Sequence, residues 1–411
     1  MSTSARRKAV GGADGLGESP EPFGASAPRG GPPGLDQRIA AFAREVVRPL
    51  APEMARGGVR HAGELIAEAG RRGLAGLLTP AALGGQDAGH VTFARAVEAV
   101  ARECASSAVI YDVHVSVASE PFALFGGEEL KRRYLPRLAS GEWLGAFALS
   151  EPGSGSDAAS LVTRAVREGD EYVLDGTKMW ITNGGEADLY VVMARTGGPG
   201  ARGISAFLVE SSWPGVRPSR PLRKLGLRGS STAELVLEGV RVPADNRLGE
   251  EGAGFRVAMS ALDSGRIGIS AQATGIAQGA LDASLAHLRA RGVEISEEAS
   301  LDEALAAAAP AVSVPLAQMA AQVAAARAVT VHAAELCDRG VPFTREAAIA
   351  KLVSTDACVA VAHAAVEICA PASHGDAHPA AIRLRDAKAC QIYEGTNQIQ
   401  RLVIARELLR A

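Results

Sequence analysis

The sequence predicts a mainly α-helical protein of the α+β class, in which a central β-domain lies between two helical domains. The first observation is composition, because aromatic residues make up only 4% of a chain that is 47% hydrophobic. Ala, Leu, Val and Ile must supply most apolar side chains, which favours helices over a β-sandwich. The second is order, because helical periodicity gives way to alternating segments and then returns. Alternating β-α units are therefore not predicted.

The 411 residues divide into four predicted segments. Residues 1–34 are rich in Gly and Pro and predict a disordered tail. Residues 35–144 repeat apolar side chains at spacings of three and four, which predicts an N-terminal helical domain. Residues 145–246 alternate in segments such as EYVLDGTKMWIT, where Asp175-Gly176 resembles a hairpin turn, and predict a β-domain. Residues 247–411 return to long helical patterns and predict a C-terminal helical bundle.

Composition also limits the function classes. The 43 Lys and Arg residues nearly balance the 46 Asp and Glu residues, so no global field favours nucleic acid. No apolar run of about 18 residues and no apolar signal segment occurs, so we expect neither a membrane span nor classical export. The five cysteines are widely spaced without a CxxC pair, which indicates neither a disulfide framework nor a zinc motif and favours a cytoplasmic location.

Sequence spacing predicts no metal site and no standard nucleotide loop. His374 and His378 are four residues apart, but Gly and Pro interrupt the segment PASHGDAHPAA, so we interpret it as a polar loop. The chain contains neither GxGxxG after a strand nor GxxxxGK[ST], which argues against a Rossmann unit and a P-loop.

Two segments carry candidate chemistry. In FALSEPGSGSDAASL, Phe147 to Leu161, small residues around Ser154 and Ser156 would let backbone amides approach a bound group, although an ordinary turn explains them as well. In RDAKACQIYEGTNQIQRLVIAREL, Glu394 lies in a Gly-containing interruption between two helical runs. A carboxylate there is either a base or a solvated surface group.

Five motifs, in order, resemble the acyl-CoA dehydrogenase family. They are FALSEPGSGSD, DGTKMWITNG, KLGLRGSSTAELVLEGVRVP, GRIGISAQATGIAQGALD and RDAKACQIYEGTNQIQRLVIAREL. The resemblance extends from about Leu35 to Arg410. It implies an N-terminal helical domain, a central β-domain and a C-terminal four-helix bundle, assembled as a homodimer or homotetramer.

The resemblance implies removal of two hydrogens from an acyl thioester, the α-hydrogen as a proton and the β-hydrogen as a hydride to N5 of FAD. Glu394 matches the family's catalytic base, and its backbone N–H is similar to one of two donors to the thioester oxygen. In some branches the base lies beside the arginine of the GRIG segment. That position here is Gly265, which carries no carboxylate, and this strengthens Glu394.

The resemblance also implies further site residues. Trp180 and Thr182 match positions that face the flavin ring, although without the motifs they would be interpreted as a buried strand pair. The predicted cofactor contacts are Leu149, Ser150, Ser156, Trp180, Thr182, Thr396 and Gln398. The predicted substrate contacts are Ser156, Arg266 and Gly395.

The sequence departs from the family where the ADP half of FAD would lie. An Arg-x-x-Phe-Gly segment, a glutamine and a Gly-Gly-x-Gly stretch are replaced, and the residues found there are Pro310, Glu367, Ala370, Pro371 and Ser373. Ala-Pro in place of Gly-Gly narrows the backbone approach and removes one N–H donor. A carboxylate at Glu367 would repel pyrophosphate. The sequence therefore predicts an FAD site that is weakened or absent.

Two functional hypotheses follow. The first is flavin-dependent α,β-dehydrogenation of an acyl thioester carried by coenzyme A or a carrier protein, with an electron-transfer flavoprotein as electron acceptor. The second is a family member without FAD that performs redox-neutral proton chemistry or acts as a non-catalytic partner subunit. A flavin-dependent monooxygenase on the same fold is disfavoured, because it needs no carboxylate at Glu394. Neither nucleic acid nor membrane is an expected partner.

Overall fold

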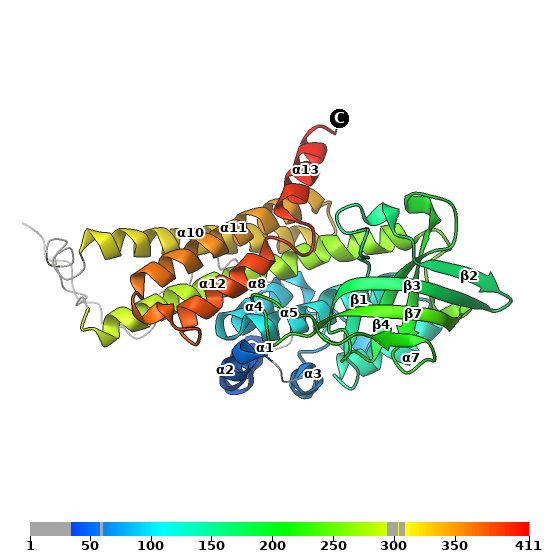
Figure 1. Cartoon of the computed structure of the whole chain (residues 1–411), viewed down its shortest axis with the longest axis horizontal. Coiled ribbons are helices and arrows are strands. Elements are labelled where there is room, and N and C mark those ends of the chain that lie inside the picture. Colours follow the sequence, from blue (N-terminus) through cyan, green and yellow to red (C-terminus); the bar gives the residue numbers. More distant parts are fainter. Residues whose placement is uncertain (1–33, 58–60, 294–302, 304–308, 411) are drawn as a thin grey trace, which may run out of the picture.

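The computed structural model describes residues 34–57, 61–293, 303 and 309–410. The predicted disordered tail, apart from its last residue, lies outside these described residues. Figure 1 shows a long bundle of helices at one end of the molecule and a twisted sheet at the other. This arrangement confirms the predicted fold class of helices, sheet and helices.

The N-terminal part is helical. Its long amphipathic helix α4 packs along α8 of the C-terminal part, while α5 runs through a π-helical segment, η3, into α6. α5 and η3 are buried along their whole length. Single π-turns within helices are frequent at functional sites, so this stretch is a place to look for one. The elements are α1 (Leu35–Phe42), η1 (Ala43–Val47), α2 (Arg48–Arg56), α3 (Ala62–Arg71), η2 (Ala81–Leu83), α4 (Gly89–Glu103), α5 (Ala105–Val113), η3 (His114–Ser119), α6 (Glu120–Phe125) and α7 (Glu128–Ala139).

The middle part is an eight-stranded sheet in the order β6-β7-β3-β2-β4-β5-β8, with β1 paired to β4. Its strands are β1 (Gly145–Ala148), β2 (Arg164–Glu168), β3 (Glu171–Thr182), β4 (Leu189–Arg195), β5 (Ile204–Glu210), β6 (Val216–Pro218), β7 (Thr232–Pro243) and β8 (Arg247–Leu248). The Asp175-Gly176 turn prediction was wrong, because both residues lie inside β3. Gly176 is needed for a different reason, since a Cβ there would lie 2.5 Å from Thr163 Oγ1.

The C-terminal part consists of long helices that run side by side, with α13 projecting from them (Figure 1). Small residues allow the close packing of α8. A Cβ on Gly275 would lie 2.4 Å from the carbonyl oxygen of Glu98 in α4. The helices are α8 (Gly254–Ala290), α10 (Pro310–Asp338), α11 (Thr344–Ile368), α12 (Pro379–Cys390) and α13 (Asn397–Leu408).

Helix α11 is, by length and composition alone, apolar enough to cross a membrane, with a mean hydropathy of 1.5 in its most apolar window. Half of that window is buried inside the protein. The helix packs against α8, α10, α12 and α13. These contacts are those of a core helix in the bundle.

Candidate active site

Glu394 lies in the short loop that joins α12 to α13. It adopts a left-handed backbone conformation with φ of 54°, and Gly395 follows with φ of 84°. A non-glycine residue in this region is uncommon and persists only when its surroundings fix it. The backbone therefore turns at Glu394 in a way that an unconstrained loop would not favour.

Side chains from α11 and α13 fix this loop. Gln400 donates from Nε2 to the carbonyl oxygens of Glu394 and Gly395, at 3.2 and 2.9 Å. The side chain of Thr396 caps α13 by accepting from the Ile399 N–H at 3.3 Å. Lys351 of α11 donates to Asn397 Oδ1 at 2.7 Å. The loop is thus held by bonds on both sides of Glu394.

The carboxyl group of Glu394 points to a glycine position on α8. A Cβ on Gly265 would lie 2.4 Å from Glu394 Oε2 and 2.8 Å from Val117 Cγ1. One turn further along α8, a Cβ on Gly268 would lie 2.0 Å from Asp112 Oδ1. Gly265 and Gly268 therefore make room for two acidic side chains, one from the loop and one from α5.

Neither acid is neutralised by a direct bond. Both carboxyl oxygens of Glu394 are buried without a hydrogen-bond partner among the described residues, and the same holds for Asp112 Oδ2. Asp112 Oδ1 accepts from Ser116 Oγ at 2.9 Å. Unpartnered buried polar atoms are rare in native proteins, and a substrate is one explanation for them.

Electrostatics make Glu394 a base suited to neutral pH. Burial raises the pKa of Glu394 to about 7, and the positive charges of Lys351 and Arg266 limit this rise. Burial, and then the charge of Glu394, raise the pKa of Asp112 well above its ordinary value. The negative charge of ionised Glu394 therefore favours the protonated form of Asp112. A base with a pKa near the working pH is most effective in proton transfer.

Arg266 lies next to Gly265 on α8 and is almost fully buried. Its Nη1 donates to Asp263, while Nε has no hydrogen-bond partner among the described residues. Asp263 also accepts from Thr344 Oγ1 at 2.8 Å, which connects this pair to the start of α11. Arg266 is thus hydrogen-bonded to Asp263 and also interacts electrostatically with the Glu394 carboxylate.

The end of β3 is anchored to the helix that carries Asp112. Asn183 follows β3 and donates from Nδ2 to the carbonyl oxygens of Ile110, at 3.4 Å, and Gly145, at 3.1 Å. Ile110 precedes Asp112 by two residues in α5. The strand end at Thr182 and the buried acids therefore belong to one connected region.

The structure brings four predicted flavin contacts together. The carbonyl oxygen of Ser150 accepts from the Met179 N–H at 2.8 Å, and that of Leu149 accepts from Lys178 Nζ at 3.2 Å. Trp180 follows directly, at a register shift of β3 against β7, with φ of 59° and 53% of its surface exposed. The interpretation of Trp180 as a buried strand residue is therefore wrong. Thr182 lies two residues further along β3, half-buried.

The remaining predicted cofactor and substrate contacts lie in loops and in the first turn of α13. Ser156 is exposed in the loop after β1, and Gln398 is exposed in the first turn of α13. Thr396 and Gly395 lie in the same loop as Glu394.

The predicted departures lie around the connection between α11 and α12. Ala370 and Pro371 are exposed there, and Ser373 is buried and donates to the Val366 carbonyl oxygen at 2.6 Å. Glu367 is exposed in the last turn of α11 and pairs with His363 at 3.5 Å. Pro310 is the first residue of α10. The chain immediately before it lies mostly outside the described residues.

Sequence reasoning missed Asp112, Lys351 and Gln272. Gln272 of α8 accepts from Tyr393 Oη, the residue before Glu394, and donates from Nε2 to the Ala105 carbonyl oxygen at 3.1 Å. A signal existed for Asp112, because it interrupts the apolar run AVIYDVHVSVA. Lys351 and Gln272 gave no such signal, since their partners are distant in sequence.

Family comparison agrees with this geometry. Residues 34–142, 146–240 and 252–409 match the N-terminal, middle and C-terminal domain models of acyl-CoA dehydrogenase. A Bacillus subtilis protein named acyl-CoA dehydrogenase is 44% identical over 376 residues, which cover 91% of this chain and 97% of that protein. The human mitochondrial short-chain specific acyl-CoA dehydrogenase is 42% identical, covering 92% of this chain and 90% of that protein.

A solved structure agrees as well. Butyryl-CoA dehydrogenase from Megasphaera elsdenii superimposes with a TM-score of 0.83 at 38% identity, covering 92% of this chain and 97% of that chain. With all three domain models matched in order, this chain belongs to the acyl-CoA dehydrogenase family.

Proposed function

We propose that this chain catalyses the flavin-dependent α,β-dehydrogenation of a short-chain acyl-CoA, with Glu394 as the base. The observation that carries the proposal is the buried, unpartnered carboxylate of Glu394, whose pKa burial raises to about 7. The short length of the acyl chain is inferred from the names of the relatives, which are short-chain specific and butyryl-CoA dehydrogenases.

The chain's own residues supply the proton chemistry. The carboxylate of Glu394 takes the α-proton of the thioester, which is weakly acidic until negative charge on its carbonyl oxygen is stabilised. Within the described part of the chain, no backbone carbonyl accepts from the Glu394 N–H, so this N–H is available to that oxygen. The positive charges of Lys351 and Arg266 limit the rise in the pKa of Glu394 and so favour its ionised form.

FAD fits the half of the site formed by the β-domain. The exposed Trp180 on its irregular strand, Thr182 and the backbone around Leu149 and Ser150 would hold the flavin ring. When bound, FAD supplies the acceptor for the β-hydrogen as hydride. The ADP half of FAD would meet the positions of Ala370 and Pro371 across the dimer, and we propose that FAD is held more weakly there. Complete loss of FAD with redox-neutral chemistry is not favoured, because the relatives are dehydrogenases.

The test is an anaerobic titration of the purified yellow protein with butyryl-CoA, followed by loss of flavin absorbance. We expect bleaching in the parent and a rate at least about a hundredfold lower in Glu394→Gln, which removes the proton acceptor while keeping the shape. Glu129→Gln is the control, because Glu129 is an exposed acid in the first turn of α7, outside the residues assigned to the site. A colourless protein, or unchanged bleaching in Glu394→Gln, would contradict the proposal.

We also propose a homodimer or homotetramer that passes electrons to an electron-transfer flavoprotein. The projecting helix α13 exposes apolar side chains that a monomer would leave in water: Leu402 is 65%, Leu408 64% and the following Leu409 86% exposed. Several large apolar side chains exposed on one projecting element favour an interaction surface there. Light scattering at micromolar concentration tests the assembly, and a monomer would contradict it.

A further inference from the structure

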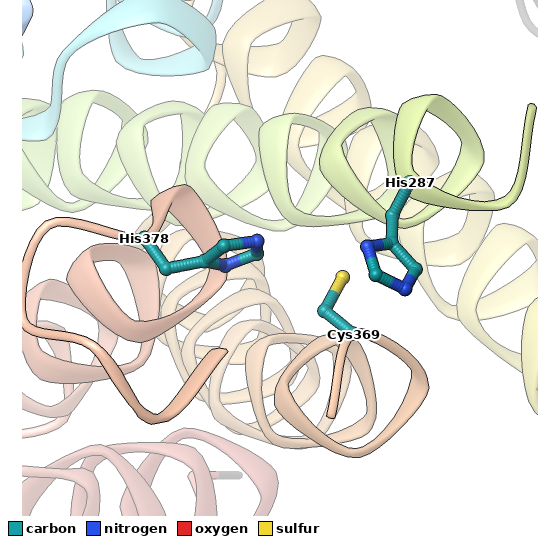
Figure 2. Close-up of side chains that lie close together, drawn as sticks. All are labelled: His287, Cys369 and His378. Atoms are coloured by element: carbon teal, nitrogen blue, oxygen red, sulfur yellow. The ribbon is translucent and has the colours of Figure 1, made fainter. Parts of the chain in front are cut away.

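Three side chains with metal-binding atoms meet at the end of the bundle distant from the sheet. His287 comes from the last turns of α8, Cys369 directly follows α11, and His378 directly precedes α12. Figure 2 shows both imidazole rings and the thiol pointing toward one another. One ligand atom from each residue lies within 4.8 Å of the other two. This His287–Cys369–His378 cluster is separate from the Glu394 loop.

We propose that the His287–Cys369–His378 cluster is a binding site for a divalent transition-metal ion, with Zn²⁺ as the expected occupant. Two imidazole nitrogens and one thiolate suit Zn²⁺, whereas Mg²⁺ and Ca²⁺ prefer oxygen ligands. Three protein ligands leave a fourth position for water. The site lies at the α11–α12 connection, and none of its three ligands belongs to the proton chemistry of Glu394.

The geometry needs only a small closure. Zinc binds nitrogen at about 2.0–2.1 Å and sulfur at about 2.3 Å, so ligand atoms around a tetrahedral ion are about 3.4–3.6 Å apart. The cluster must therefore contract by about 1 Å from its 4.8 Å limit. Both histidines are partly exposed, so rotation of their side chains can supply this movement, while Cys369 is fully buried and fixed.

Competing interactions at the cluster are weak. Cys369 Sγ is 4.0 Å from the Ala283 carbonyl oxygen, at the limit of a sulfur hydrogen bond. The rings of His287 and His378 stand edge to face with centroids 6.4 Å apart. His378 Nδ1 accepts from the Ala380 N–H at 3.3 Å, a long bond that caps α12. If His378 binds metal through Nε2, the ring proton moves to Nδ1 and this cap bond is exchanged for the metal bond.

A bound ion would tie three chain segments together. It would connect α8 to the stretch between Cys369 and His378, which includes Ala370 and Pro371. Metal bound only by the folded arrangement stabilises that arrangement. The ion would therefore hold the stretch that has lost the family's glycines.

The experiment is a Co²⁺ titration of the full-length protein after treatment with a chelator. We expect one ion per chain and a thiolate-to-cobalt charge-transfer band, both removed by competing Zn²⁺. Loss of one outer-sphere partner costs about 10–100-fold in affinity, so removing a ligand in His287→Gln, His378→Gln or Cys369→Ala should weaken binding by about a hundredfold or more.

His374→Gln is the matched control, because His374 lies in the same stretch but outside the cluster. It should bind Co²⁺ within about twofold of the parent, on the scale where each ligand lost costs far more. Circular dichroism without metal checks that each variant is folded. The proposal is overturned if the charge-transfer band is absent from the parent, or if it survives in Cys369→Ala.

Discussion

Gly265 and Glu394 are in contact across the interface between α8 and the α12–α13 loop, and the space for the base exists only because residue 265 has no side chain. A Cβ at this position would lie 2.4 Å from Glu394 Oε2. The carboxylate therefore occupies the volume that a side chain on α8 would otherwise fill. The location of the base is determined as much by this absence as by the residues that hold the loop.

Gly265→Ala should displace the Glu394 carboxylate. A misplacement of about 1 Å can cost about a hundredfold in rate, so we expect the reduction of flavin by butyryl-CoA to slow by about tenfold or more. Gly63→Ala is the control, because a Cβ there meets nothing within 4 Å. An unchanged rate in Gly265→Ala would show that the carboxylate can act from another position.

The rate of flavin reduction should rise with pH and level off, because only ionised Glu394 accepts the proton. Burial raises the pKa of Glu394 to about 7, so the half-maximal rate is expected near pH 7. Lys351→Gln removes a positive charge that lowers this pKa, so its pH profile should move to higher pH. Rapid-mixing kinetics between pH 5 and pH 9 measure both profiles. A shift to lower pH would refute the assigned role of Lys351.

Glu394→Gln should be more stable than the parent at alkaline pH. The folded pKa of about 7 is above the ordinary value of 4.5, so ionising Glu394 opposes folding. The parent keeps the full stability of the protonated form below about pH 4.5 and loses it as pH rises through about 7. The loss is at most about 3 kcal/mol by the usual conversion of 1.36 kcal/mol per pKa unit. Urea unfolding at pH 5 and pH 8.5 tests this, and an equal stability difference at both pH values would contradict it.

Restoring glycine at positions 370 and 371 should raise the affinity for FAD. The double variant Ala370→Gly/Pro371→Gly reopens the backbone approach and returns one N–H donor. A hydrogen bond to a charged group contributes about 1.5–3 kcal/mol, which corresponds to roughly tenfold or more in affinity. Fluorescence titration of both deflavinated proteins measures the change. A parent that already binds FAD tightly and stoichiometrically would disprove the weakened site.

Much of the fold was predictable because periodicity is a local property. The apolar spacing in α8 and the alternation in β7 are visible in single segments. The Asp175-Gly176 turn prediction failed because an Asp-Gly pair can occur in a hairpin turn or inside a strand that passes close to a neighbouring segment. The glycine there permits close approach to Thr163 within a continuing strand, and only the packed sheet shows this.

The candidate site was predictable only where a motif carried it. Glu394 stood out through its interrupted helix and the family resemblance. Asp112 acquires its meaning from Glu394, which is nearly three hundred residues away in the chain. The His287–Cys369–His378 cluster was missed because ligand spacing was sought within single segments, and only folding brings α8, α11 and α12 together.

Helix α13 begins three residues after Glu394 and carries exposed leucines near its far end. Movement of this projecting helix would therefore be transmitted to the loop that holds the proton acceptor. If a second chain packs against those leucines, it immobilises α13, and the α12–α13 loop becomes more rigid as a result. Catalytic rate per chain would then depend on protein concentration, falling on dilution before any secondary structure is lost. In such an enzyme, association of the chains would control how accurately the Glu394 carboxylate is positioned for proton transfer.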